Sequence, residues 1–101
     1  MKMTVVRYRI KPDCRDENTR LLQSVFKELQ EKAPDGVSYV TLQSGDGWYT
    51  HFTTVDGDGV NPITLLDSFK AYVAGVKERC AEPPHQANDV TIVGNYRMIG
   101  G

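Results

Sequence analysis

Residues 37–55, VSYVTLQSGDGWYTHFTTV, contain the pattern that decides the fold class. Val37–Leu42 is rich in β-branched and aromatic residues, which favour a strand. Ser44–Gly47 is typical of a tight turn, and Trp48–Val55 is again strand-like. We therefore predict a β-hairpin in the middle of the chain.

A strand and a helix are predicted before this hairpin. Residues 4–10 alternate, with Val6, Tyr8 and Ile10 on one face, as in a half-buried strand. Acidic residues at 13–17 suit a helix start. Apolar residues then recur at helical spacing, and Pro34 ends a helix of roughly twenty residues; this stripe comprises Leu21, Leu22, Val25, Phe26 and Leu29.

A second helix and a last strand are predicted after the hairpin. Asn61-Pro62 is a helix-start pair, and Glu82-Pro83-Pro84 is expected to stop the helix. The last strand is expected at Val90–Arg97, continuing through Met98-Ile99. The apolar stripe of this helix is Leu65, Leu66, Phe69, Val73, Val76 and Cys80.

The order β-α-β-β-α-β predicts a single ferredoxin-like α+β domain over residues 1–101. Right-handed crossovers place both helices on one face of a four-stranded antiparallel sheet of order 4-1-3-2. We expect strands one and three to be parallel to each other, and the two helices likewise. Cys14 and Cys80 would then lie about a helix length apart, too far for a disulfide.

The sheet face without helices also carries apolar residues. Trp48 and Phe52 lie on one face of the third strand, opposite Tyr49 and Val55. A second covering layer is therefore expected, and a homodimer through the sheet is preferred over a monomer with a solvated face. Arg7 and Arg9 share a face of the first strand, where they can pair with acids across the dimer or bind a carboxylate ligand.

Composition excludes several functions. A net charge of -1 with scattered Lys and Arg gives no reason to expect nucleic acid or a membrane surface as partner. No leader-like apolar run follows Met1-Lys2-Met3, so a cytoplasmic protein with free thiols is expected. The loop at 56–59, DGDG, lacks the later ligands of a calcium loop, and no Cys/His spacing suits zinc. We predict no metal and no cofactor.

His51 is the main catalytic candidate. It is the one side chain on a predicted central strand that normally titrates near neutrality, so it can serve as a general base. It can equally be a structural His hydrogen-bonded to a neighbour. Aromatic residues can line a pocket for a planar substrate or fill the core; the substrate-binding candidates are Tyr8, Trp48, Phe52 and Phe69.

The sequence resembles the dimeric α/β-barrel superfamily, and within it the antibiotic-biosynthesis-monooxygenase-like proteins. The resemblance rests on residues 5–12, Tyr49-Thr50-His51-Phe52, Asn61-Pro62, residues 78–84 and Val93–Arg97. It implies a homodimer with a small-molecule cavity between sheet and helices. Some relatives oxidise aromatic polyketides with O2 and no cofactor, and others degrade haem through a helical His, which neither predicted helix contains.

Two hypotheses about the function of the protein follow from these residues and from the resemblance. The first is a small-molecule-binding protein that oxidises an aromatic substrate without a cofactor, with His51 in the site. The second is a non-enzymatic dimeric module that binds a metabolite or another protein.

Overall fold

The computed structural model describes residues 1–57 and 59–98. Its strands are β1 (Lys2–Ile10), β2 (Val37–Ser44), β3 (Trp48–Val55) and β4 (Cys80–Ala87). Its helices are α1 (Arg15–Lys32), α2 (Asp67–Ala74) and α3 (Val76–Arg79), with short 3-10 turns at Pro12–Cys14 and Pro62–Leu65. No helix in these described parts is long and apolar enough to cross a membrane.

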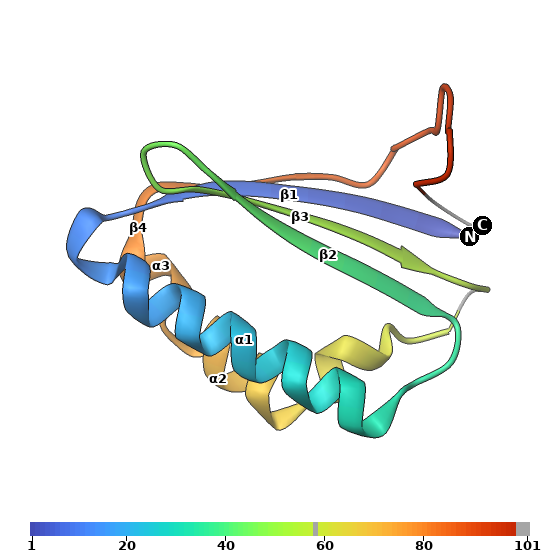
Figure 1. The fold of residues 1–101 in the computed structure, drawn as a ribbon, viewed down its shortest axis with the longest axis horizontal. Coiled ribbons are helices and arrows are strands. Elements are labelled where there is room, and N and C mark those ends of the chain that lie inside the picture. Colours follow the sequence, from blue (N-terminus) through green and yellow to red (C-terminus); the bar gives the residue numbers. More distant parts are fainter. Residues whose placement is uncertain (58, 99–101) are drawn as a thin grey trace.

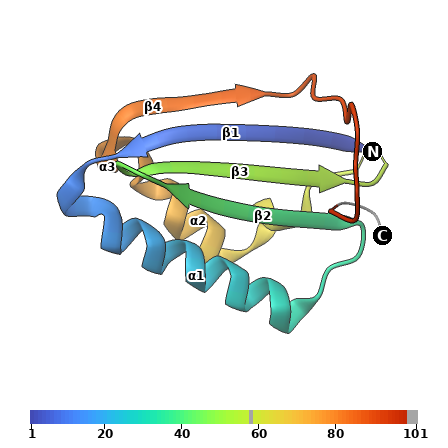
Figure 2. The ribbon, with the colours of Figure 1, turned by 45° about the horizontal axis from the view of Figure 1, so that its top comes forward.

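The predicted architecture is confirmed. The strands form one antiparallel sheet of order β2-β3-β1-β4, which is the predicted 4-1-3-2 order (Figure 2). All three helices cover one face of this sheet (Figure 1). The β2–β3 hairpin falls where the SGDG turn predicts it, and Gly47 in this turn has a φ of +83°, which glycine adopts without a Cβ clash.

The last strand is not where the sequence pattern predicted it. Val90–Arg97 forms no strand, and β4 begins at Cys80, directly after α3. Pro83 and Pro84, expected to stop the helix, lie inside β4. β4 is an edge strand that pairs only with β1, so one proline can face its outer side without loss of a hydrogen bond. The two prolines also lie where the β1–β4 register shifts, between Glu82 opposite Arg9 and His85 opposite Arg7, and a bulge there needs no regular ladder donor. Ile99, the expected end of the last strand, lies outside the described residues.

The second helical segment is shorter than predicted. The Asn61 side chain accepts a hydrogen bond from the Ile63 N–H, but it caps a 3-10 turn and the α-helix begins only at Asp67. Leu65 and Val73, expected in the buried stripe, are 64% and 46% exposed. Tyr72 takes the buried position instead, at 6% exposed.

The relative direction of the helices also differs from prediction. β1 and β3 are antiparallel rather than parallel, so α1 and α2, which follow them, run in opposite directions (Figure 1). Ile10 pairs with Cys80, and Cys14 therefore lies at the same end of the sheet as Cys80. Both thiols are free, but the separation by a helix length that we expected is wrong.

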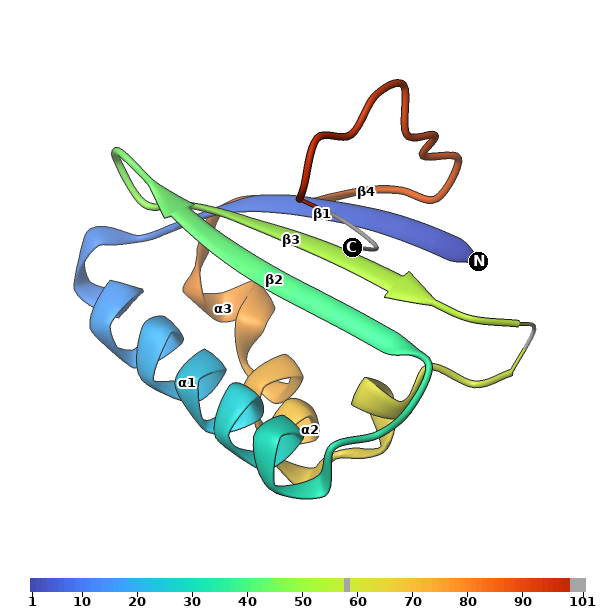
Figure 3. The same cartoon turned by 45° about the vertical axis from the view of Figure 1, so that its right-hand side comes forward.

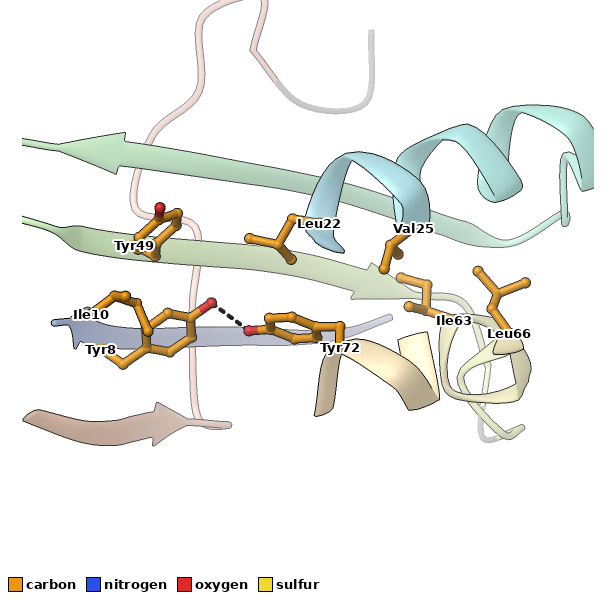
Figure 4. Close-up of a cluster of buried hydrophobic side chains, with 8 residues drawn as sticks. All are labelled: Tyr8, Ile10, Leu22, Val25, Tyr49, Ile63, Leu66 and Tyr72. Atoms are coloured by element: carbon orange, nitrogen blue, oxygen red, sulfur yellow. Dashed lines mark hydrogen bonds between the residues drawn. The ribbon is translucent and has the colours of Figure 1, made fainter. Parts of the chain in front are cut away.

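The core lies between the sheet and the helices. Tyr8 and Ile10 of β1 and Tyr49 of β3 point toward the helices, as the alternation predicts. They meet Leu22 and Val25 of α1, and Ile63, Leu66 and Tyr72 complete the cluster (Figure 4). The segment after β4, residues 88–98, lies on the opposite side of the sheet (Figures 1 and 3).

Candidate functional site

A cavity of about 320 Å³ lies between the sheet and the α2 side of the helical layer. Val6 of β1, Phe69 of α2 and Val76 of α3 supply apolar parts of its wall. Tyr8, Tyr39, His51 and Tyr72 supply a hydrogen-bonded polar group of its wall, and we call these four residues the His51 cluster. Other polar residues also line the cavity, namely Thr4, Thr53, Asn61, Thr64 and Gln86. This volume is at the lower end of the range typical of small-molecule sites.

The His51 cluster is a chain of hydrogen bonds centred on the imidazole. His51 Nε2 lies 2.8 Å from the Tyr8 hydroxyl, which is in turn hydrogen-bonded to the Tyr72 hydroxyl (Figure 4). His51 Nδ1 lies 2.6 Å from the Tyr39 hydroxyl and 3.0 Å from Thr41 Oγ1. The chain therefore runs from α2 through β1 and β3 to β2.

Local strand geometry explains why these side chains meet. Tyr8 on β1 and His51 on β3 both lie on the helix-facing side of adjacent strands, and His51 is the cross-strand partner of both Val6 and Thr41. Tyr39 is one side-chain repeat from Thr41 on β2, so it reaches the same side. Its ring stacks on Phe26 of α1, with ring centroids 4.7 Å apart.

Burial keeps the cluster uncharged at neutral pH. Loss of hydration lowers the pKa of His51 to about 4 and raises the pKa of Tyr8 to about 12. The pKa values of Tyr39 and Tyr72 are raised for the same reason. His51 is thus a neutral imidazole at pH 7, with one ring nitrogen donating and the other accepting.

A buried arginine is connected to the His51 cluster by hydrogen bonds. Arg79 of α3 is 6% exposed, and its Nε–H donates to Asn18 Oδ1 over 3.1 Å. Its Nη2 donates to the Tyr72 carbonyl over 2.7 Å. Asn18 of α1, fully buried, donates from Nδ2 to the Tyr8 hydroxyl at 3.4 Å. No carboxylate of residues 1–57 or 59–98 forms an ion pair with Arg79.

The structure brings some of the predicted site residues together and separates others. Tyr8, His51 and Phe69 line one cavity. Trp48 and Phe52 lie on the opposite face of β3 and do not line it; the Trp48 ring instead packs under the Arg7 guanidinium, 4.0 Å from the ring centroid. Arg9 pairs with Asp46 and Glu82 of its own chain.

Asn18 and Arg79 were not predicted as site residues, although both are polar residues at helical spacing from buried apolar positions. Asn18 stands four and seven residues before Leu22 and Val25, on the buried stripe of α1. Arg79 stands seven residues after Tyr72, again on a buried face. A polar residue at such a position needs a buried partner, which is the feature that would have pointed to this network.

The fold and the cavity together define a ferredoxin-like α+β protein with a small-molecule-sized space between sheet and helices. Comparison with solved structures then shows that the chain has the fold of the antibiotic-biosynthesis-monooxygenase-like proteins, as the sequence resemblance implied. No protein-family model matches the sequence, and no curated protein matches it.

Three of these structures illustrate the likeness. A candidate antibiotic biosynthesis monooxygenase from Bacteroides thetaiotaomicron superposes with a TM-score of 0.76 at 14% identity, covering 96% of this chain and 94% of the other. One from Caulobacter crescentus has a TM-score of 0.67 at 19% identity, covering 89% and 90%. A conserved protein from Methanosarcina mazei has a TM-score of 0.69 at 18% identity, covering 86% and 89%.

Proposed function

We propose that the protein binds a small aromatic molecule in the cavity beside His51 and oxidises it with O2 without a cofactor. The observation that carries this proposal is the combination of apolar walls with the hydrogen-bonded His51 cluster in one cavity. Apolar walls suit a planar ring, and the few convergent polar groups would hold an oxygen substituent. The likeness to structures named as antibiotic biosynthesis monooxygenases supports the same reading.

His51 is the proposed proton acceptor of this reaction. A base with a pKa of about 4 takes protons efficiently only from an already acidic group, so the substrate would be an activated phenol or an aryl ketone with an acidic C–H. Both ring nitrogens face tyrosine hydroxyls, and the proton would reach His51 through one of them. The resulting electron-rich anion can reduce O2, and the balanced change at an activated methylene is CH2 + O2 → C=O + H2O.

Oxygen consumption tests the enzymatic proposal. Anthrone has an acidic methylene between aromatic rings, and we expect O2 uptake with formation of the matching ketone when the protein is added. His51→Gln should abolish this uptake while the fold is retained. His85→Gln is the matched control, because His85 is an exposed histidine on β4 and lies outside the cavity lining. Equal uptake by the wild type and His51→Gln would remove His51 from the reaction.

A non-enzymatic binding module is the second candidate. It is favoured by one observation, namely that both ring nitrogens of His51 already have partners within the chain. This candidate predicts saturable binding of aromatic molecules with no O2 uptake above the buffer rate for phenols or aryl ketones.

We further propose that two copies pack through the helix-free sheet face. Val5 of β1, Phe52 of β3 and Val40 of β2 stand in register as one apolar row across this face. Leu42, two residues along β2, is 59% exposed. Apolar area of this kind on a sheet with helices on one side only supports a second layer, which a two-fold related copy can supply.

A further inference from the structure

The hydrogen bonds of the His51 cluster leave one phenolic proton without an acceptor inside the cluster. The shorter contacts order the four side chains as Tyr72–Tyr8–His51–Tyr39, and the Tyr72 hydroxyl lies in addition 3.3 Å from His51 Nε2. Each neutral member brings one proton, because a tyrosine has one O–H and a neutral imidazole has one N–H. His51 Nε2 has either one proton or one lone pair, so it fully uses only one of its contacts to Tyr8 and Tyr72. At most three of the four protons therefore find an acceptor within the cluster, and one member must donate elsewhere.

Arg79 and Asn18 restrict where this surplus proton can be. Arg79 can only donate, so Asn18 Oδ1 accepts from it and Asn18 Nδ2 donates to the Tyr8 oxygen. The Asn18 bond occupies one of the two lone pairs of the Tyr8 oxygen. Of its two remaining hydrogen bonds, to Tyr72 and to His51, the Tyr8 hydroxyl must therefore accept one and donate the other. His51 cannot hold the surplus proton, because both of its nitrogens are hydrogen-bonded. The surplus proton is therefore on an end of the chain, Tyr39 or Tyr72.

The buried cation favours Tyr39. Hydrogen bonds that all run in one direction polarise one another and strengthen the chain. Starting from the guanidinium, a uniform direction is Arg79 to Asn18 to Tyr8 to His51 to Tyr39. The opposite arrangement makes Tyr8 accept from both Asn18 and His51, so two dipoles oppose each other beside an unpaired buried charge.

We propose that the cavity selects ligands by a hydrogen-bond-accepting oxygen, an aryl ketone or phenolate oxygen, which the Tyr39 hydroxyl contacts directly. This inference rests on the proposed small-molecule function and names the substrate feature that this site reads. In the resting protein His51 is the Nδ1–H tautomer, with Nε2 accepting from Tyr8. A ligand with the same shape but no acceptor oxygen leaves the Tyr39 proton unpaired and binds more weakly.

Thr41 is the competing acceptor near Tyr39 and supplies a control. Its Oγ1 lies 3.0 Å from His51 Nδ1, but a hydroxyl brings a proton together with its oxygen and so does not remove the surplus. Thr41 lines the groove between α1 and β2 rather than the cavity. Thr41→Val should therefore leave ligand selection unchanged.

The tautomer is tested first, by long-range proton–nitrogen NMR of the histidine rings. The chain has two histidines, so His85→Gln assigns the signals of His51. We expect the proton on Nδ1 at pH 7. A proton on Nε2 would overturn the direction of the chain and place the surplus on Tyr72.

Ligand selection is tested with 1-tetralone and tetralin, which differ in one carbonyl oxygen. We expect the wild type to bind 1-tetralone about tenfold more tightly than tetralin, because one additional hydrogen bond changes an affinity by about this factor. Tyr39→Phe should abolish this difference by weakening 1-tetralone alone, and Tyr72→Phe and Thr41→Val should retain it. Equal affinities in the wild type, or loss of the difference in Tyr72→Phe but not in Tyr39→Phe, would overturn the inference.

Failure of the proposed function gives a different result from failure of this inference. If neither molecule binds at millimolar concentration, the cavity has no small-molecule function and the ligand selection falls with it. If both bind equally, the cavity function stands and only the selection by an acceptor oxygen is wrong.

Discussion

At the scale of single residues, the feature with most consequences is an imidazole kept neutral by burial. His51 is 5% exposed, and burial lowers its pKa to about 4 from the ordinary 6.5. Unfolding restores hydration, so between these two pH values the unfolded chain binds more protons than the folded one. The unfolding free energy therefore carries no penalty from His51 above about pH 6.5, and it falls as the pH decreases from 6.5 toward 4.

This linkage gives the first prediction. Between pH 7 and pH 4 the wild type should lose about 3 kcal/mol of unfolding free energy through His51, from a pKa difference of about 2.5. Urea unfolding at several pH values measures this slope. His51→Gln should flatten the part between pH 6.5 and 4.5, and a variant with the wild-type slope would contradict the assignment to His51.

The second prediction concerns Arg79. Arg79→Met removes the donors to Asn18 Oδ1 and to the Tyr72 carbonyl, leaving two buried acceptors unpaired. We expect a loss of roughly 3 kcal/mol in denaturant unfolding. Lys77→Met is the matched control on the same helix, because Lys77 is exposed. Equal stability of the two variants would mean that the buried guanidinium does not support the cluster.

Part of the site could be predicted from residue types, and part could not. Alternation on β1 predicts Tyr8 on the same face as Val6 and Ile10, and helical spacing predicts Phe69 on the apolar stripe of the second helix. The structure brings both of them to the cavity that contains His51. Trp48 and Phe52 were also candidates, because aromatic character alone does not say which face of the sheet holds the cavity. The link from Arg79 through Asn18 joins residues 61 positions apart and depends on the packing of two helices.

At the scale of elements, local patterns recovered the fold except where tertiary pairing overrode them. The alternation of β1 and the SGDG turn located three strands correctly. The prediction of the last strand was wrong because Pro83-Pro84 is locally typical of a helix stop, whereas the edge strand β4 accommodates both prolines. The β-branched run at 90–93 looked strand-like but has no partner strand within the described sheet.

Hydrogen exchange checks this placement of the last strand. The Val6 amide belongs to a central strand that pairs with both β3 and β4, whereas Val93 is fully exposed outside the sheet. We expect strong protection at Val6 and exchange near the free-peptide rate at Val93. Comparable protection at both amides would restore the strand that the sequence pattern predicted at 90–97.

One carboxylate connects α1 with α2 by hydrogen bonds, in addition to their apolar packing. Glu28 accepts hydrogen bonds from the backbone N–H and the hydroxyl of Ser68, in the first turn of α2, and pairs with Lys32. These bonds, led by the Ser68 hydroxyl, lower the pKa of Glu28 to about 2 from 4.5. A lowered carboxyl pKa means stability that is present above pH 4.5 and is lost as the pH falls toward 2.

We therefore expect Glu28→Gln to lower the thermal unfolding temperature at pH 7 and to reduce the acid sensitivity below pH 4.5. Glu31→Gln is the control, since Glu31 is an exposed glutamate on the same helix. If the two variants melt together at every pH, the Glu28–Ser68 contact does not join the helices.

At the scale of the whole molecule, we propose that the helix-free face of the sheet is an interface between two copies and that the helix-covered side holds a binding site. The row formed by Val5, Phe52 and Val40 lies on the interface side, with Leu42 beside it. Leu42→Lys should convert the proposed dimer to monomer in native mass spectrometry and leave the fold intact. Lys27→Glu on the exposed surface of α1 is the control. A wild-type monomer at micromolar concentration would contradict the dimer.

An NMR titration of the wild type with 1-naphthol at pH 7 shows whether the cavity beside His51 binds a small aromatic molecule. We expect saturable shifts at the amides of Val6, Phe69 and Val76, which line the cavity beside His51, with Val5 and Leu42 unaffected. Shifts confined to the helix-free face, or no shift at millimolar ligand, would contradict a small-molecule site in this cavity.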